Sequence, residues 1–87
     1  MRIKVEKPSV ATVAEMERCP IWTKEVSVFP WEYDATETCY VLEGEVTVTT
    51  AEGEAVAFGP GDLVTFPRGL TCTWDVRKPI RKHYRFG

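Results

Sequence analysis

The chain has 87 residues, with 11 basic and 13 acidic side chains and a formal net charge of −2. A chain of this length buries roughly 60% of the surface that its unfolded form exposes, so we expect one domain, residues 1–87, with a single core. The balanced charge argues against binding to nucleic acid or to an anionic membrane, and no stretch approaches the ~20 consecutive apolar residues of a membrane span.

The N-terminal segment and the cysteines indicate the compartment. Charged side chains recur up to Lys7, so no secretory signal is expected. The three cysteines lack a Cys-x-x-Cys spacing and are typical of free thiols in a reducing compartment. We therefore expect a cytoplasmic protein, or an organellar one if a transit peptide has been removed.

The N-terminal part of the chain predicts one edge strand and one short helix. Residues 1–7 alternate apolar and charged side chains as a half-buried strand does, and Pro8 stops the pattern. Ser9 can cap a helix over residues 10–18. The residues at helical spacing are Val10, Val13, Ala14 and Glu17.

From Ile21 onward the hydrophobic period changes to two and stays there. Gly or Pro stands at nearly every junction, with Pro30 expected to halt one strand and Glu43-Gly44 to form a turn. About eight short strands at this spacing predict an all-β sandwich or barrel with one short N-terminal helix. The expected strands are residues 21–29, 31–33, 37–42, 45–50, 54–58, 62–66, 71–76 and 80–86.

A corner between two of these strands carries a specific spacing. Gly61, Pro67 and Gly69 stand as in the pattern G-x5-P-x-G-x2-H-x3-N, the second motif of the cupins. Cys72 stands where that motif has a histidine ligand, and Val76 stands where it has an asparagine. The chain thus resembles the cupins, and the resemblance implies an all-β double-stranded β-helix, the small jelly roll of that family.

The first cupin motif, G-x5-H-x-H-x3,4-E-x6-G, is matched by Glu37 and Gly44. Trp31 and Tyr33 occupy its two histidine positions, and its opening glycine is absent. The resemblance therefore covers the residues that shape the scaffold, whereas most of the family's metal ligands are replaced.

Three segments resemble more specifically the small single-domain cupins grouped with the cupin domain of (S)-ureidoglycine aminohydrolase. These segments are residues 37–44, 61–69 and 82–84, and the resemblance extends over residues 21–86. That enzyme is a longer, two-domain, manganese-dependent protein, and its histidine ligands have no counterparts in this sequence.

Strand alternation decides which side chains share the interior of such a barrel. If Glu37 faces inward, Cys39 does too, and Cys72 and Trp74 lie together on one face of a later strand. On the last strand, the apolar neighbours of Tyr84 favour an inward set of residues 82, 84 and 86 over the set 81, 83 and 85. The predicted ligand-binding residues are Trp31, Tyr33, Cys39, Cys72 and Trp74.

A carboxyl group among these aromatic side chains would be desolvated and could act as an acid or a base near neutral pH, unless a lysine pairs with it. We hypothesise that Glu37, Lys82 and Tyr84 are catalytic residues that orient a small polar ligand or exchange a proton with it. The alternative is a buried hydrogen bond from Lys82 or Tyr84 to Glu37 that fixes the strand register.

No cofactor is predicted, because transition-metal sites ordinarily use three or more His, Cys or carboxylate ligands and His83 is the only histidine of the chain. A divalent ion such as Mn, Fe, Ni or Zn could still be held by Glu37, Cys72 and one further group. Cys39 and Cys72 could be nucleophiles, although buried free cysteines are mostly inert. The basic residues 77–85 are interpreted as a solvated edge strand rather than a site for phosphate or carboxylate.

Three function classes follow from these candidates. A binding module requires an open cavity at Glu37. So does an enzyme, metal-dependent or not, that performs hydrolase- or isomerase-like chemistry on a small polar metabolite. A structural or interaction protein requires a barrel plugged by Trp31, Trp74 and Phe86. We expect the binding role, with a small-molecule ligand, and a homodimer in which a second copy covers the sheet edges.

Overall fold

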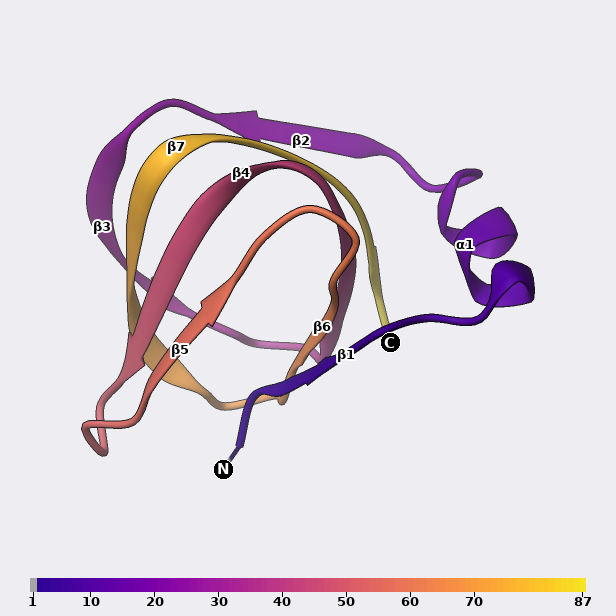
Figure 1. Cartoon of the computed structure of the whole chain (residues 1–87). Helices are drawn as coiled ribbons and strands as arrows, with labels where there is room; N and C mark the ends of the chain where they lie inside the picture. Colours follow the sequence, from indigo (N-terminus) through magenta and orange to yellow (C-terminus); the bar gives the residue numbers. More distant parts are fainter. Residues whose placement is uncertain (1) are drawn as a thin grey trace.

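The computed structural model describes residues 2–87, and in this range it has one helix and seven strands in one antiparallel sheet (Figure 1). The elements are β1 (Lys4–Glu6), α1 (Val10–Met16), β2 (Ile21–Lys24), β3 (Ser27–Glu32), β4 (Glu37–Thr50), β5 (Ala55–Phe58), β6 (Leu63–Phe66) and β7 (Thr71–Phe86). The predicted all-β class with one short N-terminal helix is confirmed. Met1, the first residue of the predicted edge strand, lies outside the described residues.

The sheet rolls up around its two long strands, β4 and β7. Its order is β1-β6-β4-β7-β2, while β3 also pairs with β7 and β5 also pairs with β4. The strands wrap around a common interior, and α1 lies outside it, beyond the start of β2 (Figure 1). The predicted edge position of the first strand is confirmed, since β1 pairs with β6 at the end of this order.

β4 continues as one strand where the sequence predicted a turn at Glu43-Gly44, so that prediction is wrong. The pairing of β4 with β7 shifts register between Val41 and Val46, which marks a β-bulge. The inward side chains change from odd-numbered residues before the bulge to even-numbered residues after it. Gly44 has a φ of 110°, and a Cβ there would lie 2.7 Å from the Cα of Ile80. Only glycine fits this close approach of β4 to β7.

Two prolines lie inside observed strands, at places where the sequence predicted a junction between two strands. β7 runs through Pro79 and joins the predicted strands 71–76 and 80–86, because Pro79 stands opposite the bulge of β4. β3 runs through Pro30 and bonds only to β7, so its other edge needs no backbone donor there. The predicted strand 21–29 is instead divided between β2 and β3.

The helix is capped as predicted but is shorter. Ser9 accepts a hydrogen bond from the backbone N–H of Thr12 at 3.2 Å through its side chain. The helix ends at Met16, and this side chain is fully buried, whereas Val10 is 88% exposed. The exposed Val10 lies off the packed face, because α1 packs on β4 and β7 through the face that carries Met16.

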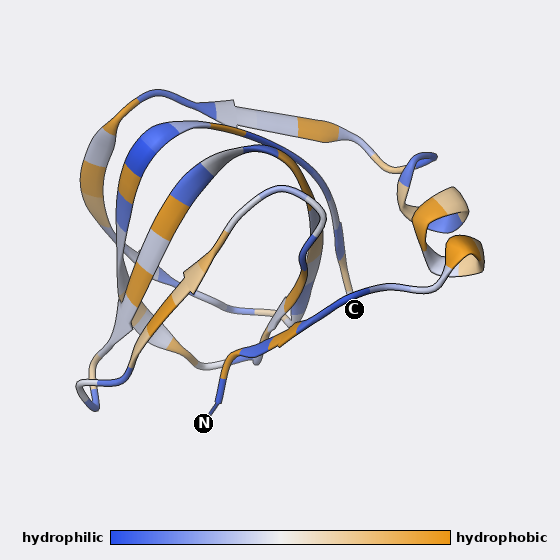
Figure 2. Ribbon diagram, viewed as in Figure 1, coloured by the Kyte–Doolittle hydropathy of each residue, from blue (hydrophilic) through white to orange (hydrophobic). Residues whose placement is uncertain are grey.

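The interior is filled by the inward side chains of the sheet. Apolar and polar residues alternate along β4 and β7 (Figure 2), so one face of each strand supplies the core. Phe66 lies at its centre, with its ring centroid 4.8 Å from that of Tyr33 and 5.5 Å from that of Trp74. No helix of residues 2–87 has the length and apolar character needed to cross a membrane.

The basic residues 77–85 belong to the most connected strand, so their interpretation as an edge strand is wrong. β7 hydrogen-bonds to β2, β3 and β4. Four of its basic side chains are exposed on the outer face and have acidic partners, which leaves little free charge there for a phosphate or a carboxylate. The pairs are Arg77–Asp75 at 3.3 Å, Lys78–Glu45 at 3.8 Å, Arg81–Glu43 at 3.9 Å and Arg85–Glu15 at 3.4 Å.

Candidate functional site

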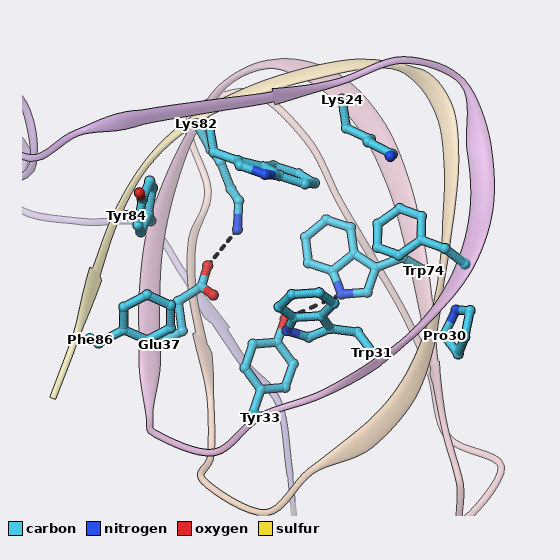
Figure 3. A pocket seen from close by; sticks show the side chains of 11 residues that line it. Lys24, Pro30, Trp31, Tyr33, Glu37, Trp74, Lys82, Tyr84 and Phe86 are labelled. Atoms are coloured by element: carbon cyan, nitrogen blue, oxygen red, sulfur yellow. Dashed lines mark hydrogen bonds and ion pairs between the residues drawn. The ribbon is translucent and has the colours of Figure 1, made fainter.

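A cavity of about 560 Å³ opens inside the sheet, between β2, β3, β7 and Glu37 at the start of β4 (Figure 3). Its wall is mostly aromatic, with a few polar groups among the rings, which is typical of a small-molecule site. The lining residues are Trp22, Lys24, Phe29, Pro30, Trp31, Tyr33, Glu37, Trp74, Lys82, Tyr84 and Phe86.

Glu37 and Lys82 form an ion pair on the inner wall. Glu37 is the first residue of β4, and Lys82 lies on β7, which runs antiparallel beside it. Strand alternation turns both side chains inward, and they are 5% and 4% exposed. The Lys82 ammonium donates a hydrogen bond to Oε2 of Glu37 (Figure 3). The hydrogen bond between Lys82 and Glu37 that the alternative interpretation named is present, and residues 82, 84 and 86 all line the cavity, as predicted for the inward set.

The Lys82 ammonium is also held between two indole rings. Its Nζ atom lies 5.0 Å from the ring centroid of Trp22 and 5.0 Å from that of Trp74. Aromatic faces attract a cation at this range, and the attraction is larger when the site is desolvated. The buried charge of Lys82 therefore has three partners, one carboxylate and two rings, and Lys82 is a fixed part of the wall.

Glu37 keeps one carboxylate oxygen for another partner. Lys82 donates to Oε2, and no donor among residues 2–87 bonds to Oε1. Within the same residues, every fully buried side-chain nitrogen or oxygen has a hydrogen-bond partner. Oε1 is therefore reachable from the cavity that Glu37 lines. A buried ionised carboxylate with an open oxygen is a strong acceptor for an N–H or O–H group.

Tyr33 supplies the second polar group of the wall. Its hydroxyl accepts a hydrogen bond from Nε1 of Trp74 at 3.2 Å and still has its own hydrogen to donate. Burial raises the pKa of Tyr33 well above the ordinary value, and the nearby charge of Glu37 raises the pKa further. Tyr33 therefore stays protonated at neutral pH and faces the cavity as a donor.

The entrance has two exposed aromatic residues, Trp31 and Phe86, which are 48% and 55% exposed. Tyr84 lies half-buried behind Phe86, with its ring centroid 5.8 Å from that of Phe86. The structural hypothesis required Trp31, Trp74 and Phe86 to plug the barrel. Instead, Trp31 and Phe86 stand at the rim and only Trp74 reaches the core, so the cavity stays open.

The two inner cysteines do not line the cavity, although the sequence placed them there. Cys39 and Cys72 are buried in the core, on the inward faces of β4 and β7. Burial raises the pKa of Cys39 to about 12 and that of Cys72 to about 11. Sγ of Cys72 lies 3.6 Å from the carbonyl oxygen of Trp31, which accepts its weak hydrogen bond. Both groups are thiols at neutral pH and therefore poor nucleophiles.

This burial predicts selective alkylation. Native protein treated with iodoacetamide at neutral pH should gain at most one adduct, at the partly exposed Cys19, whereas denatured protein should gain adducts at all three cysteines. Intact mass gives the number of adducts, and peptide mapping gives their positions. Rapid modification of Cys39 or Cys72 in the native protein would contradict this placement.

The side chains do not fit a transition metal. Nowhere in residues 2–87 do three His, Cys, Asp or Glu side chains gather closely enough to hold an ion. Glu37 and Cys72, the two metal ligands considered from the sequence, each have another partner. Glu37 has Lys82 as its counter-ion, and the Cys72 thiol bonds to a backbone carbonyl. A buried carboxylate already neutralised by a lysine is a poor ligand for a divalent cation.

Sequence reasoning missed Trp22, Lys24 and Phe29, which also line the cavity. A period-two signal was available, because Trp22 and Lys24 share one face of β2, and Phe29 shares a face with Trp31 and Tyr33. The register that brings Trp22 opposite Lys82 depends on the pairing of β2 with β7 and could not be read from either strand alone.

Two comparisons with known proteins cover nearly the whole chain. The family model of the EutQ-like cupin domain (Cupin_3) matches residues 12–84. The crystal structure of a DUF861 family protein from Thermotoga maritima is 52% identical, with a TM-score of 0.95, and the alignment covers 99% of this chain and 100% of that one. No curated protein matches the chain significantly.

Longer proteins share the same fold. A putative ethanolamine utilization protein Q (EutQ) from Salmonella typhimurium is 29% identical over 76% of this chain and 53% of its own, with a TM-score of 0.69. The EutQ protein of Clostridium difficile is 23% identical over 76% of this chain and 52% of its own, with a TM-score of 0.70. The chain thus spans about half the length of these EutQ proteins. The matches confirm the predicted double-stranded β-helix fold.

Proposed function

Because this chain belongs to the EutQ-like cupin domain family, we propose that its barrel binds one small ligand without a metal ion, with Glu37 as the central contact. The observation that carries this proposal is the open oxygen of Glu37, a charged acceptor inside a mostly aromatic cavity. Burying a carboxylate away from water costs free energy. A role as a hydrogen-bond acceptor for a ligand explains why the protein has one there.

The other polar groups complement this acceptor. The Tyr33 hydroxyl is a donor, so a ligand that carries both a donor and an acceptor can bond to Glu37 and Tyr33 at once. The rings of Trp31 and Tyr84 offer apolar surface to the body of the same ligand. Lys82 acts on the ligand through Glu37, which it holds in one orientation.

Proton transfer is the second candidate, and the same open oxygen favours it. An ionised carboxylate in a desolvated site can take a proton from one atom of a bound ligand and return it to another, while the protonated Tyr33 hydroxyl donates a hydrogen bond to the negative charge that develops on the ligand. This chemistry would be of the hydrolase or isomerase kind. Tyr84 also lines the cavity, so its hydroxyl remains a candidate for orienting the ligand or exchanging a proton with it.

The likeness to the cupins grouped with (S)-ureidoglycine aminohydrolase stays a hypothesis about the ligand. Most residues of the matching segments 37–44 and 61–69 belong to the core, the bulge and the β5–β6 turn. The resemblance therefore concerns mainly residues that shape the fold, and few that line the cavity. Glu37, and Lys82 and Tyr84 of the third segment, 82–84, are the exceptions, since all three line the cavity. The homodimer also stays a prediction.

The binding function can be tested by capturing the ligand. The purified protein is equilibrated with a bacterial metabolite extract and washed by ultrafiltration, and the retained small molecules are released by denaturation and measured by mass spectrometry. We expect at least one compound to be retained by the wild type. Glu37→Gln should lose it, because the amide is uncharged and accepts a weaker hydrogen bond.

Glu45→Gln is the matched control, since Glu45 lies on the same strand but points outward and is exposed. It should retain the same compound as the wild type. The double variant Glu37→Gln/Lys82→Met guards against misfolding of the single variant, because it removes both buried charges together. Retention by either Glu37 variant at the wild-type level, or no retention by the wild type, would overturn the proposal.

A further inference from the structure

The charges in the cavity wall do not cancel. Three charged side chains line it, Lys24, Glu37 and Lys82, and Glu37 neutralises Lys82. Tyr33 stays protonated because burial raises its pKa, so it adds no negative charge. The wall therefore carries one surplus positive charge, that of Lys24.

Lys24 has no acidic partner of its own. Its Nζ atom lies 5.3 Å from the ring centroid of Phe29, and the described residues place no carboxylate within ion-pair distance of it. By contrast, the basic residues on the outer face of β7 have acidic neighbours. Lys24 lies at the end of β2, on the side of the cavity away from Glu37 (Figure 3).

A cationic ligand would meet unfavourable neighbours at the inner end of the cavity, around Lys82 and Glu37. The faces of Trp22 and Trp74 are already occupied by the Lys82 ammonium. Glu37 is already the counter-ion of Lys82, so a second cation beside it would meet two lysines and one carboxylate. Like charges at this range cost free energy in a site of low dielectric.

We propose that the ligand is a small monocarboxylate with a planar or apolar body, whose carboxylate approaches Lys24 while a donor at its other end bonds to Glu37. This inference rests on the proposed binding function and specifies its ligand class. One surplus positive charge matches a monoanion, whereas a phosphate monoester would bring a charge of about −1.5 to −2. The aromatic surface between the two polar ends fits the body of such a ligand.

The test uses probes of one shape and different charge. The probes are 4-hydroxybenzoate, 4-hydroxybenzamide, 4-hydroxybenzylamine and 4-hydroxyphenyl phosphate, with benzoate as the probe that lacks the inner donor. All three tryptophans of the chain line the cavity, so the indole N–H signals in a heteronuclear NMR titration report occupancy directly. Dissociation constants follow from the concentration dependence of those shifts.

We expect 4-hydroxybenzoate to bind about tenfold more tightly than the amide, the amine and the phosphate, as one charge-assisted hydrogen bond allows. Lys24→Met should reduce the preference over the amide to about twofold or less. Lys78→Met, which removes an equal charge from the outer face of the sheet, should leave the preference unchanged. Benzoate should bind more weakly than its hydroxylated form.

The outcomes separate the two proposals. Binding of the amide, the amine or the phosphate at least as tightly as 4-hydroxybenzoate overturns the monocarboxylate inference and leaves the binding function standing. An unchanged preference in Lys24→Met also overturns the inference, because the charge then comes from elsewhere. If no probe moves an indole signal at millimolar concentration, the monocarboxylate inference fails, and the metabolite capture decides the binding function separately.

Discussion

Lys82→Met is expected to lower the free energy of unfolding by about 3–5 kcal/mol, because it leaves the buried carboxylate of Glu37 without its counter-ion. In the wild type the Lys82 ammonium bonds to Glu37 and lies between the rings of Trp22 and Trp74. Both partners of the ion pair are almost fully buried, so water can solvate the unpaired carboxylate only from the cavity side. Urea denaturation followed by tryptophan fluorescence measures the change.

The double variant Glu37→Gln/Lys82→Met should recover most of this loss. Replacing both members of a buried ion pair by neutral groups of similar volume is often close to neutral in stability. The methionine thioether also makes favourable contacts with aromatic rings, which suits a position between two indoles. Lys78→Met, on the outer face, controls for the charge change and should alter stability by no more than about 1 kcal/mol.

This comparison of variants also distinguishes the two interpretations that the sequence left open for Glu37 and Lys82, a functional site or a contact that fixes the strand register. If the ion pair mainly fixes the strand register, the double variant should be as unstable as Lys82→Met. If the pair serves the cavity, the double variant should be nearly as stable as the wild type and should still fail to retain a ligand. The second result is the one expected from the open oxygen of Glu37.

The sequence predicted the wall residues that lie on β4 and β7 better than those on β2. Alternation alone placed Glu37, Trp74 and Lys82 inside, because each lies on a long strand whose neighbours keep one period. The same rule placed Cys39 and Cys72 inside, which is correct for the core. It could not show that aromatic side chains separate these thiols from the cavity, since packing in three dimensions decides that.

The strand boundaries were less predictable, for a physical reason. Pro30 and Pro79 normally interrupt a strand, but whether they do depends on which backbone groups have partners on the neighbouring strand. Pro30 lies on a strand with a free edge, and Pro79 lies opposite a bulge. Both features depend on how strands that are far apart in the sequence pair with each other. Gly44 was read as a turn because positive φ angles are commonest in turns, although bulges use them as well.

Gly44→Ala is expected to lower the free energy of unfolding by about 3–5 kcal/mol, the combined cost of a strained backbone and an overpacked contact. Gly44 has a φ of 110°, and the new Cβ would lie 2.7 Å from both the Cα of Ile80 and the carbonyl oxygen of Pro79. These are backbone atoms of β7, so relief requires the two central strands of the sheet to separate. Urea denaturation measures the loss.

Gly53→Ala is the matched control, because Gly53 also has a positive φ, 91°, but a Cβ there would meet nothing within 4 Å. It should cost only the backbone strain, about 1–2 kcal/mol. The excess loss in Gly44→Ala then measures the close approach of β4 to β7. Since the bulge at Gly44 sets which side chains of β4 face inward, the indole signals around the cavity should shift in Gly44→Ala and stay in place in Gly53→Ala. Equal losses in the two variants would show that the bulge tolerates a side chain and that Glu37 owes its inward position to something else.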